Sequence, residues 1–403
     1  MRLPSSQGCL TPVNLSRLET CNGAVPRTLK GAVSLTIGLI ALACLSCHKK
    51  EPPPRPYLAF VVNNQSQSVA VVDLADPKVV ATIPVAPLPE KAVRRPGHHQ
   101  IYVVSQSGKI SVIDFPALRV SHTIDIGQSA GNLLFSPDGN HAYTIDPRAG
   151  QVVFLDCNTQ KETGRISLVP NLAQIAITPD GKTLIVSDPA GNRLFLISAD
   201  TQKVLGNVIV GKTPGPLAVS LDSSVVYVAD TGDEKISAAQ VSSRTIIAHI
   251  ETGSRPDALV LKPDGGELFV LSGEASTMTI VDVSHENVEQ VLPTGRRPIA
   301  AAFKQDSSVM YLATGGDGSV TAFDIVNRAV ESTIHMGVSP RALALTPDER
   351  FLAVVDGASG TLAVTRSTPL SMVAVIPVGS NPVDIIIPGW EWTNSSRQES
   401  RSD

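Results

Sequence analysis

From Tyr57 almost to its end, the chain alternates short apolar runs with polar turn segments. A representative unit spans residues 255–295 and reads RPDALVLKPDGGELFVLSGEASTMTIVDVSHENVEQVLPTG. Its apolar runs are mostly β-branched and aliphatic and are separated by Gly, Pro, Asp and Ser, which is the pattern of short strands joined by turns. Each unit therefore predicts four β-strands.

Three sets of residues recur with one spacing, which is 42 residues after a first step of 41. The first set lies in motifs such as VYVAD and comprises Tyr102, Tyr143, Ile185, Tyr227, Phe269, Tyr311 and Ala353. The second set is mostly glycine and comprises Gly127, Val169, Gly211, Gly253, Gly295, Gly337 and Gly379. The third set is acidic and comprises Asp73, Asp114, Asp156, Asp282 and Asp324. Tandem units of this length with four strands each indicate a β-propeller.

Turn residues and composition place the strands within each unit. Pro-Asp-Gly suits a tight turn because proline fixes φ and glycine accepts positive φ, and it begins at Pro137, Pro179 and Pro263. The aspartate after the third strand, such as Asp282, is predicted to accept hydrogen bonds from the backbone of the next turn. The strand before Pro-Asp-Gly is rich in alanine, which favours the innermost position, where the blades converge.

The repeat arithmetic predicts an all-β fold, a β-propeller of four-stranded antiparallel blades. The series begins at Tyr57 with three strands and ends near Asn381 with a lone innermost strand. Pairing of these N- and C-terminal strands would complete an eighth blade and remove the open edge of the ring. Eight blades are therefore expected; seven blades, with one poor copy expelled, is the alternative.

The poorest copy is PLPEKAVRRPGHHQ, and it raises a question about Arg94. This arginine occupies a position where the other copies are apolar: Phe135, Ile177, Val219, Leu261, Phe303, Leu345 and Ile387. A buried guanidinium is costly unless it is paired. We expect either an acidic partner or a strand that has slipped out of its blade, and this local distortion is the favoured reading.

The chain divides into a leader over residues 1–47, a Pro-rich linker over 48–56, the propeller over 57–389 and a polar tail over 390–403. The leader contains the uncharged apolar run 31–46, preceded by Arg27 and Lys30, as in a secretory signal. The run ends in Cys44-Leu45-Ser46-Cys47-His48, which has the C-x-x-C-H spacing of covalent c-type haem attachment.

Covalent haem at Cys44, Cys47 and His48 is disfavoured, because too few residues separate His48 from the first strand to fold around the group. A lipoprotein signal is favoured instead, with lipidation at Cys47 or alternatively Cys44. Plain secretion and an uncleaved anchor remain open. The expected location is the cell envelope, periplasmic or on the outer face of the membrane, with the membrane as partner.

Composition limits the classes of function. The 403 residues are 42% hydrophobic and 17% charged, so the chain can bury a large core. The net charge is −4, and since residues 1–46 carry +3, about −7 remains on the rest. Nucleic acid is therefore not an expected partner. The sequence shows no nucleophile elbow, phosphate-binding loop or cluster of metal ligands.

The VYVAD motif at Val226–Asp230, with Gly-x-x-Pro and Pro-Asp-Gly at fixed offsets, resembles the YVTN-type β-propeller repeat family of bacterial and archaeal cell-envelope proteins. The resemblance covers residues 57–389 and implies a propeller that serves in adhesion, ligand binding or, in some members, catalysis. The family is also distantly similar to propellers that hold d-type haem through histidines, but no set of histidines occupies equivalent mouth positions in this sequence.

Charged residues at repeat positions define a candidate ligand-binding face. The loops that join the fourth strand of one unit to the first strand of the next share one rim with the loops between second and third strands. On the first set of loops lie the cations Lys212, Arg255, Arg296, Arg297 and Arg341. The same rim receives Asp146, Asp188, Asp230 and Asp356. Loops on a rigid scaffold are where binding residues concentrate, and guanidinium groups suit carboxylate or phosphate.

The leading functional hypothesis is a lipid-anchored, non-catalytic binding or scaffolding protein with no cofactor and no metal. Its expected partner, besides the membrane, is an envelope protein or a small polar or anionic ligand. The alternative is a propeller enzyme of the lactonase or d-haem-processing type, with its site at the channel mouth.

Overall fold

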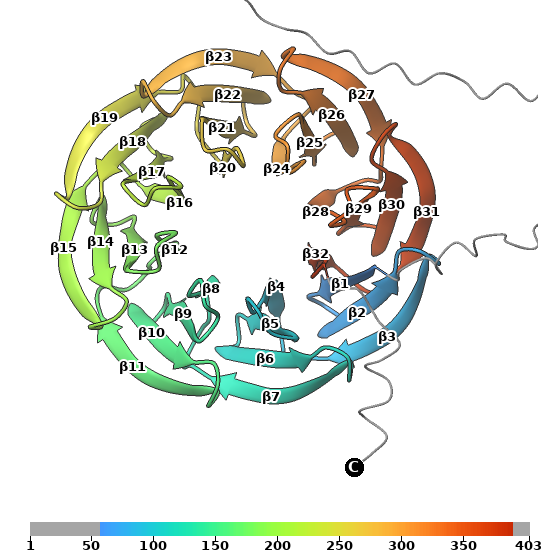
Figure 1. Cartoon of the computed structure of the whole chain (residues 1–403), viewed down its shortest axis with the longest axis horizontal. Helices are drawn as coiled ribbons and strands as arrows, with labels where there is room; N and C mark the ends of the chain where they lie inside the picture. The colour runs from blue at the N-terminus through green and yellow to red at the C-terminus, as the bar shows by residue number, and fades with distance from the viewer. Residues whose placement is uncertain (1–56, 390–403) are drawn as a thin grey trace, which may run out of the picture. The chain divides into compact units, whose positions relative to one another are not determined.

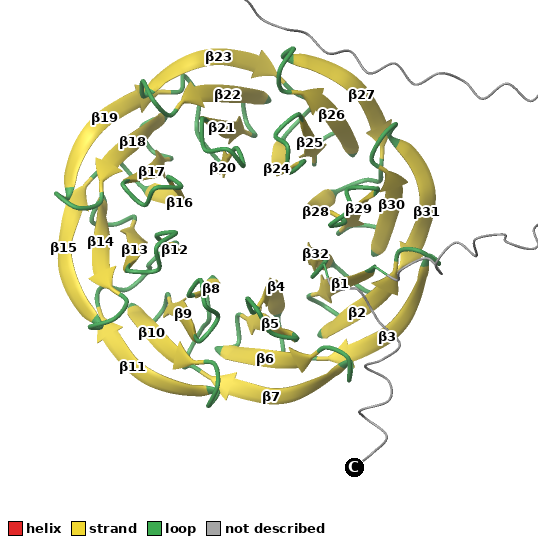
Figure 2. Cartoon of the chain, in the orientation of Figure 1, coloured by secondary structure: helices red, strands yellow, loops and turns green. Residues whose placement is uncertain are grey.

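The computed structural model describes residues 57–389, which form eight four-stranded antiparallel sheets arranged as the blades of a ring (Figure 1). All secondary-structure elements assigned within residues 57–389 are strands (Figure 2). The prediction of an eight-bladed propeller is confirmed, and the seven-bladed alternative is not. Cys44, Cys47 and His48, and with them the lipidation and haem-attachment hypotheses, lie outside the described residues. Across residues 57–389 no helix has the length and hydropathy needed to span a bilayer.

The innermost strands surround the axis of the ring. They are β32 (Pro382–Ile386), β4 (Pro89–Arg94), β8 (Leu133–Phe135), β12 (Ile175–Ile177), β16 (Pro214–Val219), β20 (Ala258–Leu261), β24 (Pro298–Phe303) and β28 (Pro340–Leu345). The second strands are β1 (Leu58–Asn63), β5 (Gln100–Ser105), β9 (His141–Asp146), β13 (Thr183–Asp188), β17 (Val225–Asp230), β21 (Glu267–Ser272), β25 (Val309–Thr314) and β29 (Phe351–Asp356).

Two further layers complete each blade outwards. The third strands are β2 (Ser68–Asp73), β6 (Lys109–Asp114), β10 (Gln151–Asp156), β14 (Arg193–Ser198), β18 (Lys235–Gln240), β22 (Thr277–Asp282), β26 (Ser319–Asp324) and β30 (Thr361–Arg366). The outermost strands are β3 (Lys78–Pro84), β7 (Arg119–Asp125), β11 (Lys161–Ser167), β15 (Lys203–Ile209), β19 (Thr245–Glu251), β23 (Asn287–Pro293), β27 (Ala329–His335) and β31 (Ser371–Pro377).

The second and third strands are apolar on both faces because each blade is covered by two neighbours. One cluster, for example, joins Tyr227 and Ile236 of one blade to Leu268 and Val281 of the next, and all four side chains are buried. The core is therefore a ring of such clusters between blades. In the outermost strands β15 and β27, by contrast, only the fourth and sixth residues are buried or half-buried, and the others are exposed.

The chain ends close the ring as predicted. β32 pairs antiparallel with β1, with Phe60 opposite Ile386 and Val61 opposite Ile385. The blade β3-β2-β1-β32 therefore contains strands from both ends of the described chain (Figure 1).

The predicted turn chemistry is also confirmed. Gly139, Gly181 and Gly265 of the Pro-Asp-Gly turns have φ of 71°, 75° and 78°, a region in which a side chain is strained. Asp282 accepts hydrogen bonds from the backbone N–H of Ser284 at 2.7 Å and of His285 at 3.3 Å.

The favoured reading of Arg94 is wrong. β4 keeps its register, with Arg94 opposite Ile101, and its shift between Pro89 and Lys91 recurs at the same position in other blades. The strand has not slipped. Arg94 is only half-buried on this innermost strand, so its guanidinium does not bear the full cost of burial. Burial nevertheless lowers the pKa of the Arg94 guanidinium.

Candidate functional site

The loops from each outermost strand to the next innermost strand meet the loops between second and third strands at one end of the ring, which we call the mouth rim. Backbone hydrogen bonds join the two kinds of loop, for example from Gly316 N to Arg296 O at 2.8 Å and from Gly232 N to Lys212 O at 3.0 Å. The opposite end, which carries the Pro-Asp-Gly turns, is called the far rim. The mouth rim is the face on which the sequence placed its candidate residues.

The four predicted aspartates lie at this rim as the last residues of their second strands, but they are buried rather than open to a ligand. Asp356 accepts hydrogen bonds from the backbone N–H groups of Val338, Ser339, Ala358 and Ser359. Asp146 likewise joins two loops, through Gln128 N at 2.9 Å and Ala149 N at 3.1 Å. These carboxylates fasten the loops of the rim, so their contacts are structural.

Asp188 and Asp230 vary this arrangement. Asp188 accepts from Gly191 N and from Arg193 Nε, both at 2.9 Å. Asp230 accepts from Ser237 Oγ at 2.5 Å, while its Oδ1 is buried with no hydrogen-bond partner. Burial raises the pKa of Asp230 to about 6, although the bonds from Ser237 and Gly211 act in the other direction. For Asp356, burial also raises the pKa, but the four backbone donors outweigh it and the net pKa is lowered.

Asp230→Asn is expected to stabilise the protein at pH 8 by about 1–2 kcal/mol, whereas Asp356→Asn destabilises it by about 2 kcal/mol. The raised pKa of Asp230 means that its contribution to stability is fully present below pH 3.8 and is lost as pH rises through about 6. Asparagine avoids that loss because it does not ionise. At Asp356 the lowered pKa makes the carboxylate stabilising at neutral pH, and an asparagine NH2 would face backbone donors.

Urea unfolding of both variants at pH 5 and pH 8 checks this pair. The gain from Asp230→Asn should grow between pH 5 and pH 8, and the cost of Asp356→Asn should shrink only as pH falls below about 4. Equal effects of the two substitutions at pH 8 would contradict the assignment.

The five predicted cations are exposed on the mouth rim, at the entrances to the four consecutive blades that begin with β16, β20, β24 and β28. We call Lys212, Arg255, Arg296, Arg297 and Arg341 the cationic arc. Lys212 forms an ion pair with Asp233 at 3.1 Å, and Arg255 with Asp257 at 3.2 Å. Among residues 57–389, Arg296, Arg297 and Arg341 make no ion pair, which leaves three guanidinium groups for a ligand.

Just inside the mouth, the innermost strands carry a second set of residues that the sequence reasoning missed. Asp384, Lys91, Ala258, Ala300 and Ala342 each pair with the penultimate residue of the second strand, so they lie at one level. The repeat spacing adds the equivalent residues of the other three blades. The eight residues at this level then form two groups of different chemistry. The polar arc is Asp384, Lys91, Asn132 and Gln174; the small arc is Pro216, Ala258, Ala300 and Ala342.

The two arcs differ in the part of the mouth rim that lies next to them. The small arc stands on the same four blades as the cationic arc, and the polar arc stands on the other four. An alignment of the repeats would have shown the division between the polar arc and the small arc, but only if the register of the innermost strands were known. At this level the innermost strands therefore carry alanine or proline on the four blades of the cationic arc, and polar residues stand on the other four.

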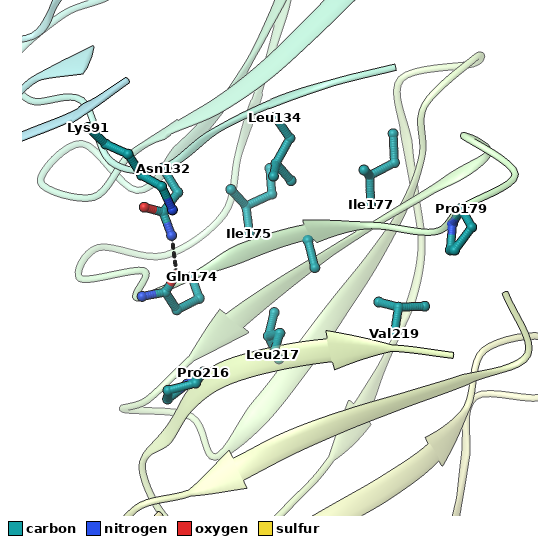
Figure 3. A pocket seen from close by; sticks show the side chains of 11 residues that line it. Lys91, Asn132, Leu134, Gln174, Ile175, Ile177, Pro179, Pro216, Leu217 and Val219 are labelled. Atoms are coloured by element: carbon teal, nitrogen blue, oxygen red, sulfur yellow. Dashed lines mark hydrogen bonds between the residues drawn. The ribbon is translucent and has the colours of Figure 1, made fainter. Parts of the chain in front are cut away.

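A cavity of about 520 Å³ opens beside the polar arc, a size in the range of small-molecule sites. Lys91, Asn132 and Gln174 line it together with Ile175, Leu217 and other apolar residues of β8, β12 and β16 (Figure 3). Asn132 Nδ2 donates a hydrogen bond to Gln174 Oε1, which orients both amides. Across residues 57–389, no group of three or more His, Cys, Asp or Glu residues is arranged to hold a metal ion.

The fold and the mouth define the class: an eight-bladed propeller with a cationic arc on its mouth rim and a cavity of small-molecule size on its innermost strands. The family model of the cytochrome D1 heme domain matches residues 263–397. That segment contains Arg296, Arg297 and Arg341, the members of the cationic arc that make no ion pair, together with Asp384. No curated protein matches the chain.

Solved structures with the same fold include "Dihydro-heme d1 dehydrogenase NirN in complex with DHE", which is 17% identical with a TM-score of 0.74 over 84% of this chain and 78% of that one. AztD from Citrobacter koseri is 14% identical with a TM-score of 0.66, covering 82% of this chain and 97% of its own. A functionally unknown protein from Desulfotomaculum acetoxidans is 16% identical with a TM-score of 0.57, over 71% and 98%. At these identities the likeness establishes the fold.

The family match corrects the prediction that no cofactor is involved. The matched model is that of a haem domain, which points to haem-related binding. The residues present fit one part of such a group, because three unpaired arginines are suited to its carboxylates.

They do not supply a histidine for its iron. Of the histidines in residues 57–389, four lie at the far rim and three on outermost strands: His98, His99, His141 and His285, and His122, His249 and His335. None is on an innermost strand, so no histidine of residues 57–389 lies on the strands that line the channel.

Proposed function

We propose that this protein binds a d1-type haem or a related carboxylated tetrapyrrole at its mouth rim. The observation that carries the proposal is the group of three unpaired arginines, Arg296, Arg297 and Arg341, within the segment that matches the haem-domain model. This proposal replaces the hypothesis of a cofactor-free binding or scaffolding protein. It retains the link to d-type haem from the alternative hypothesis. The lactonase alternative gains no support from the comparisons.

The geometry supports binding of a flat, amphipathic anion. Guanidinium groups offer fixed pairs of donors that match carboxylate oxygens. Beneath them, Ala258, Ala300 and Ala342 leave a wall without bulky side chains, against which an apolar ring can lie. Such a ring loses water-exposed apolar surface on binding, which supplies most of the favourable free energy.

Binding without a histidine ligand favours a role in holding or delivering the tetrapyrrole over one in redox turnover. The envelope location stays a prediction and rests on the apolar run 31–46 and the Pro-rich linker 48–56. The YVTN-type resemblance is compatible with this proposal, since envelope propellers of that family include ligand-binding members.

Replacing Arg296, Arg297 and Arg341 together by alanine is expected to weaken tetrapyrrole binding about 30-fold, which corresponds to about 2 kcal/mol. Each exposed guanidinium contributes only a fraction of this, because water screens its contact with a carboxylate. Absorbance titration of the purified propeller with d1-type haem and with an iron-free dicarboxylate porphyrin measures the dissociation constants.

The matched control replaces Arg119, Arg244 and Arg350, which are exposed at the far rim, and so removes the same charge. This control should bind like the wild type. Equal weakening by both triple variants would show a general charge effect instead of a site, and a wild type that binds no tetrapyrrole would refute the proposal.

A further inference from the structure

The polar arc is a second group of chemically distinctive residues in the channel, and the rim arginines do not account for it. Four consecutive blades carry a polar residue on the innermost strand (β32 and β4) or directly before it (β8 and β12), at a level where the other four have alanine or proline. An innermost strand needs only small residues to pack, so packing does not require this set. Lys91 is exposed, and it lines the 520 Å³ cavity beside Asn132 and Gln174.

We propose that Lys91, Asn132, Gln174 and Asp384 form a specificity subsite for carbonyl oxygens on the edge of the ligand opposite to its carboxylates. This inference rests on the proposed function and names the substituents that the protein selects: keto or amide groups attached to a tetrapyrrole ring.

The donors that remain available explain the choice of a carbonyl. Asn132 Nδ2 is used by Gln174 Oε1, so the Gln174 amide keeps its own N–H groups for a ligand (Figure 3). The Lys91 ammonium offers up to three N–H donors and forms no ion pair with another residue in 57–389. Donors aimed into a cavity discriminate strongly against a ligand that lacks the matching acceptor, because they then lose their water without replacement.

Asp384 adds a dependence on pH. Burial raises its pKa to about 6, opposed by the hydrogen bond from Ala92 N and by the charge of Lys91. The strands packed against β32 are β4, β28, β1 and β29. Their other charged residues are Glu90, Arg94, Arg341 and Asp356, and Lys91 is the charged group that shifts Asp384.

Below pH 6 the carboxyl is protonated and can donate a hydrogen bond to a carbonyl; above it, the carboxylate repels one. Selection of a carbonyl-bearing ligand should therefore be about threefold stronger at pH 5.5 than at pH 7.5, where the donors of Lys91 and Gln174 remain.

Two iron-free porphyrins test the subsite directly. Diacetyldeuteroporphyrin IX and mesoporphyrin IX carry the same two propionates, and the acetyl carbonyls of the first replace the ethyl groups of the second on the opposite edge. Fluorescence titration at pH 5.5 should show wild-type protein binding the diacetyl compound about tenfold more tightly. Lys91→Met and the double variant Asn132→Leu with Gln174→Leu should each bring the ratio of the two dissociation constants close to one.

Further variants separate this inference from the function on which it rests. Asp384→Asn should make the ratio independent of pH, because an amide donates at every pH. Alanine at Arg296, Arg297 and Arg341 should weaken both porphyrins equally, and Lys182→Met, exposed at the far rim, should keep the wild-type ratio. Equal binding of both porphyrins to wild type overturns the subsite alone, whereas no binding of either overturns the proposed function as well.

Discussion

A chain that ends at Ser380 is expected to lose its cooperative fold and to aggregate. The shortened chain lacks β32, the strand that pairs with β1 and places Ile385 in the core between the last blade and the first. Its loss exposes the backbone of β1 along a flat apolar edge, which invites pairing with another chain. It also uncovers apolar surface on β4 and β28, the neighbours of β32.

Circular dichroism melting and size-exclusion chromatography measure this effect. A chain that ends at Gly389 keeps β32 and should melt and elute like the full chain. If the chain ending at Ser380 stays monomeric with an unchanged melting temperature, closure by β32 is not what holds the ring together.

Arg95→Met is expected to cost about 3–4 kcal/mol of stability. The Arg95 side chain is 3% exposed and makes four hydrogen bonds at the far rim, between two blades. Its guanidinium donates to Gly139 O at 2.7 Å, Gln100 Oε1 at 2.9 Å, Cys157 O at 3.1 Å and Asn158 Oδ1 at 2.5 Å. Methionine fills similar volume but leaves the buried carbonyl oxygens of Gly139 and Cys157 without this donor.

Chemical denaturation with a two-state fit gives the change in unfolding free energy. Arg148→Met is the control, because Arg148 is exposed and its side chain makes no hydrogen bond to another residue in 57–389. The control should change stability by less than about 0.5 kcal/mol. A comparable small effect at Arg95 would mean that the bonds it makes contribute little net stability.

Much of the candidate site could be located from the sequence, since repeat spacing alone placed Lys212, Arg255 and Arg341 on one rim. What spacing could not show is which charges are already satisfied. Asp356 looked like a rim carboxylate in the sequence, yet it is buried under four backbone donors. Burial and hydrogen bonding depend on how two loops at the mouth rim pack against each other. A local sequence pattern does not predict that packing.

The polar arc was missed for a related reason. Asn132, Gln174, Lys91 and Asp384 are far apart in the chain and differ in type, so they form no motif. They become a set only when the innermost strands stand at one level around the axis.

By itself, the sequence determined the strands, the turns, the period and the number of blades, because these follow from local alternation of apolar and turn residues repeated at a fixed spacing. Closure by the last strand also followed, since one blade lacked one strand and the chain ended with one to spare. Only the tertiary structure decided that Arg94 stays in register and Arg95 is buried between blades. It alone showed which rim charges are free and that one half of the channel is polar. These properties depend on contacts between residues tens to hundreds of positions apart, whose energies are set by geometry around the ring and not by neighbours along the chain.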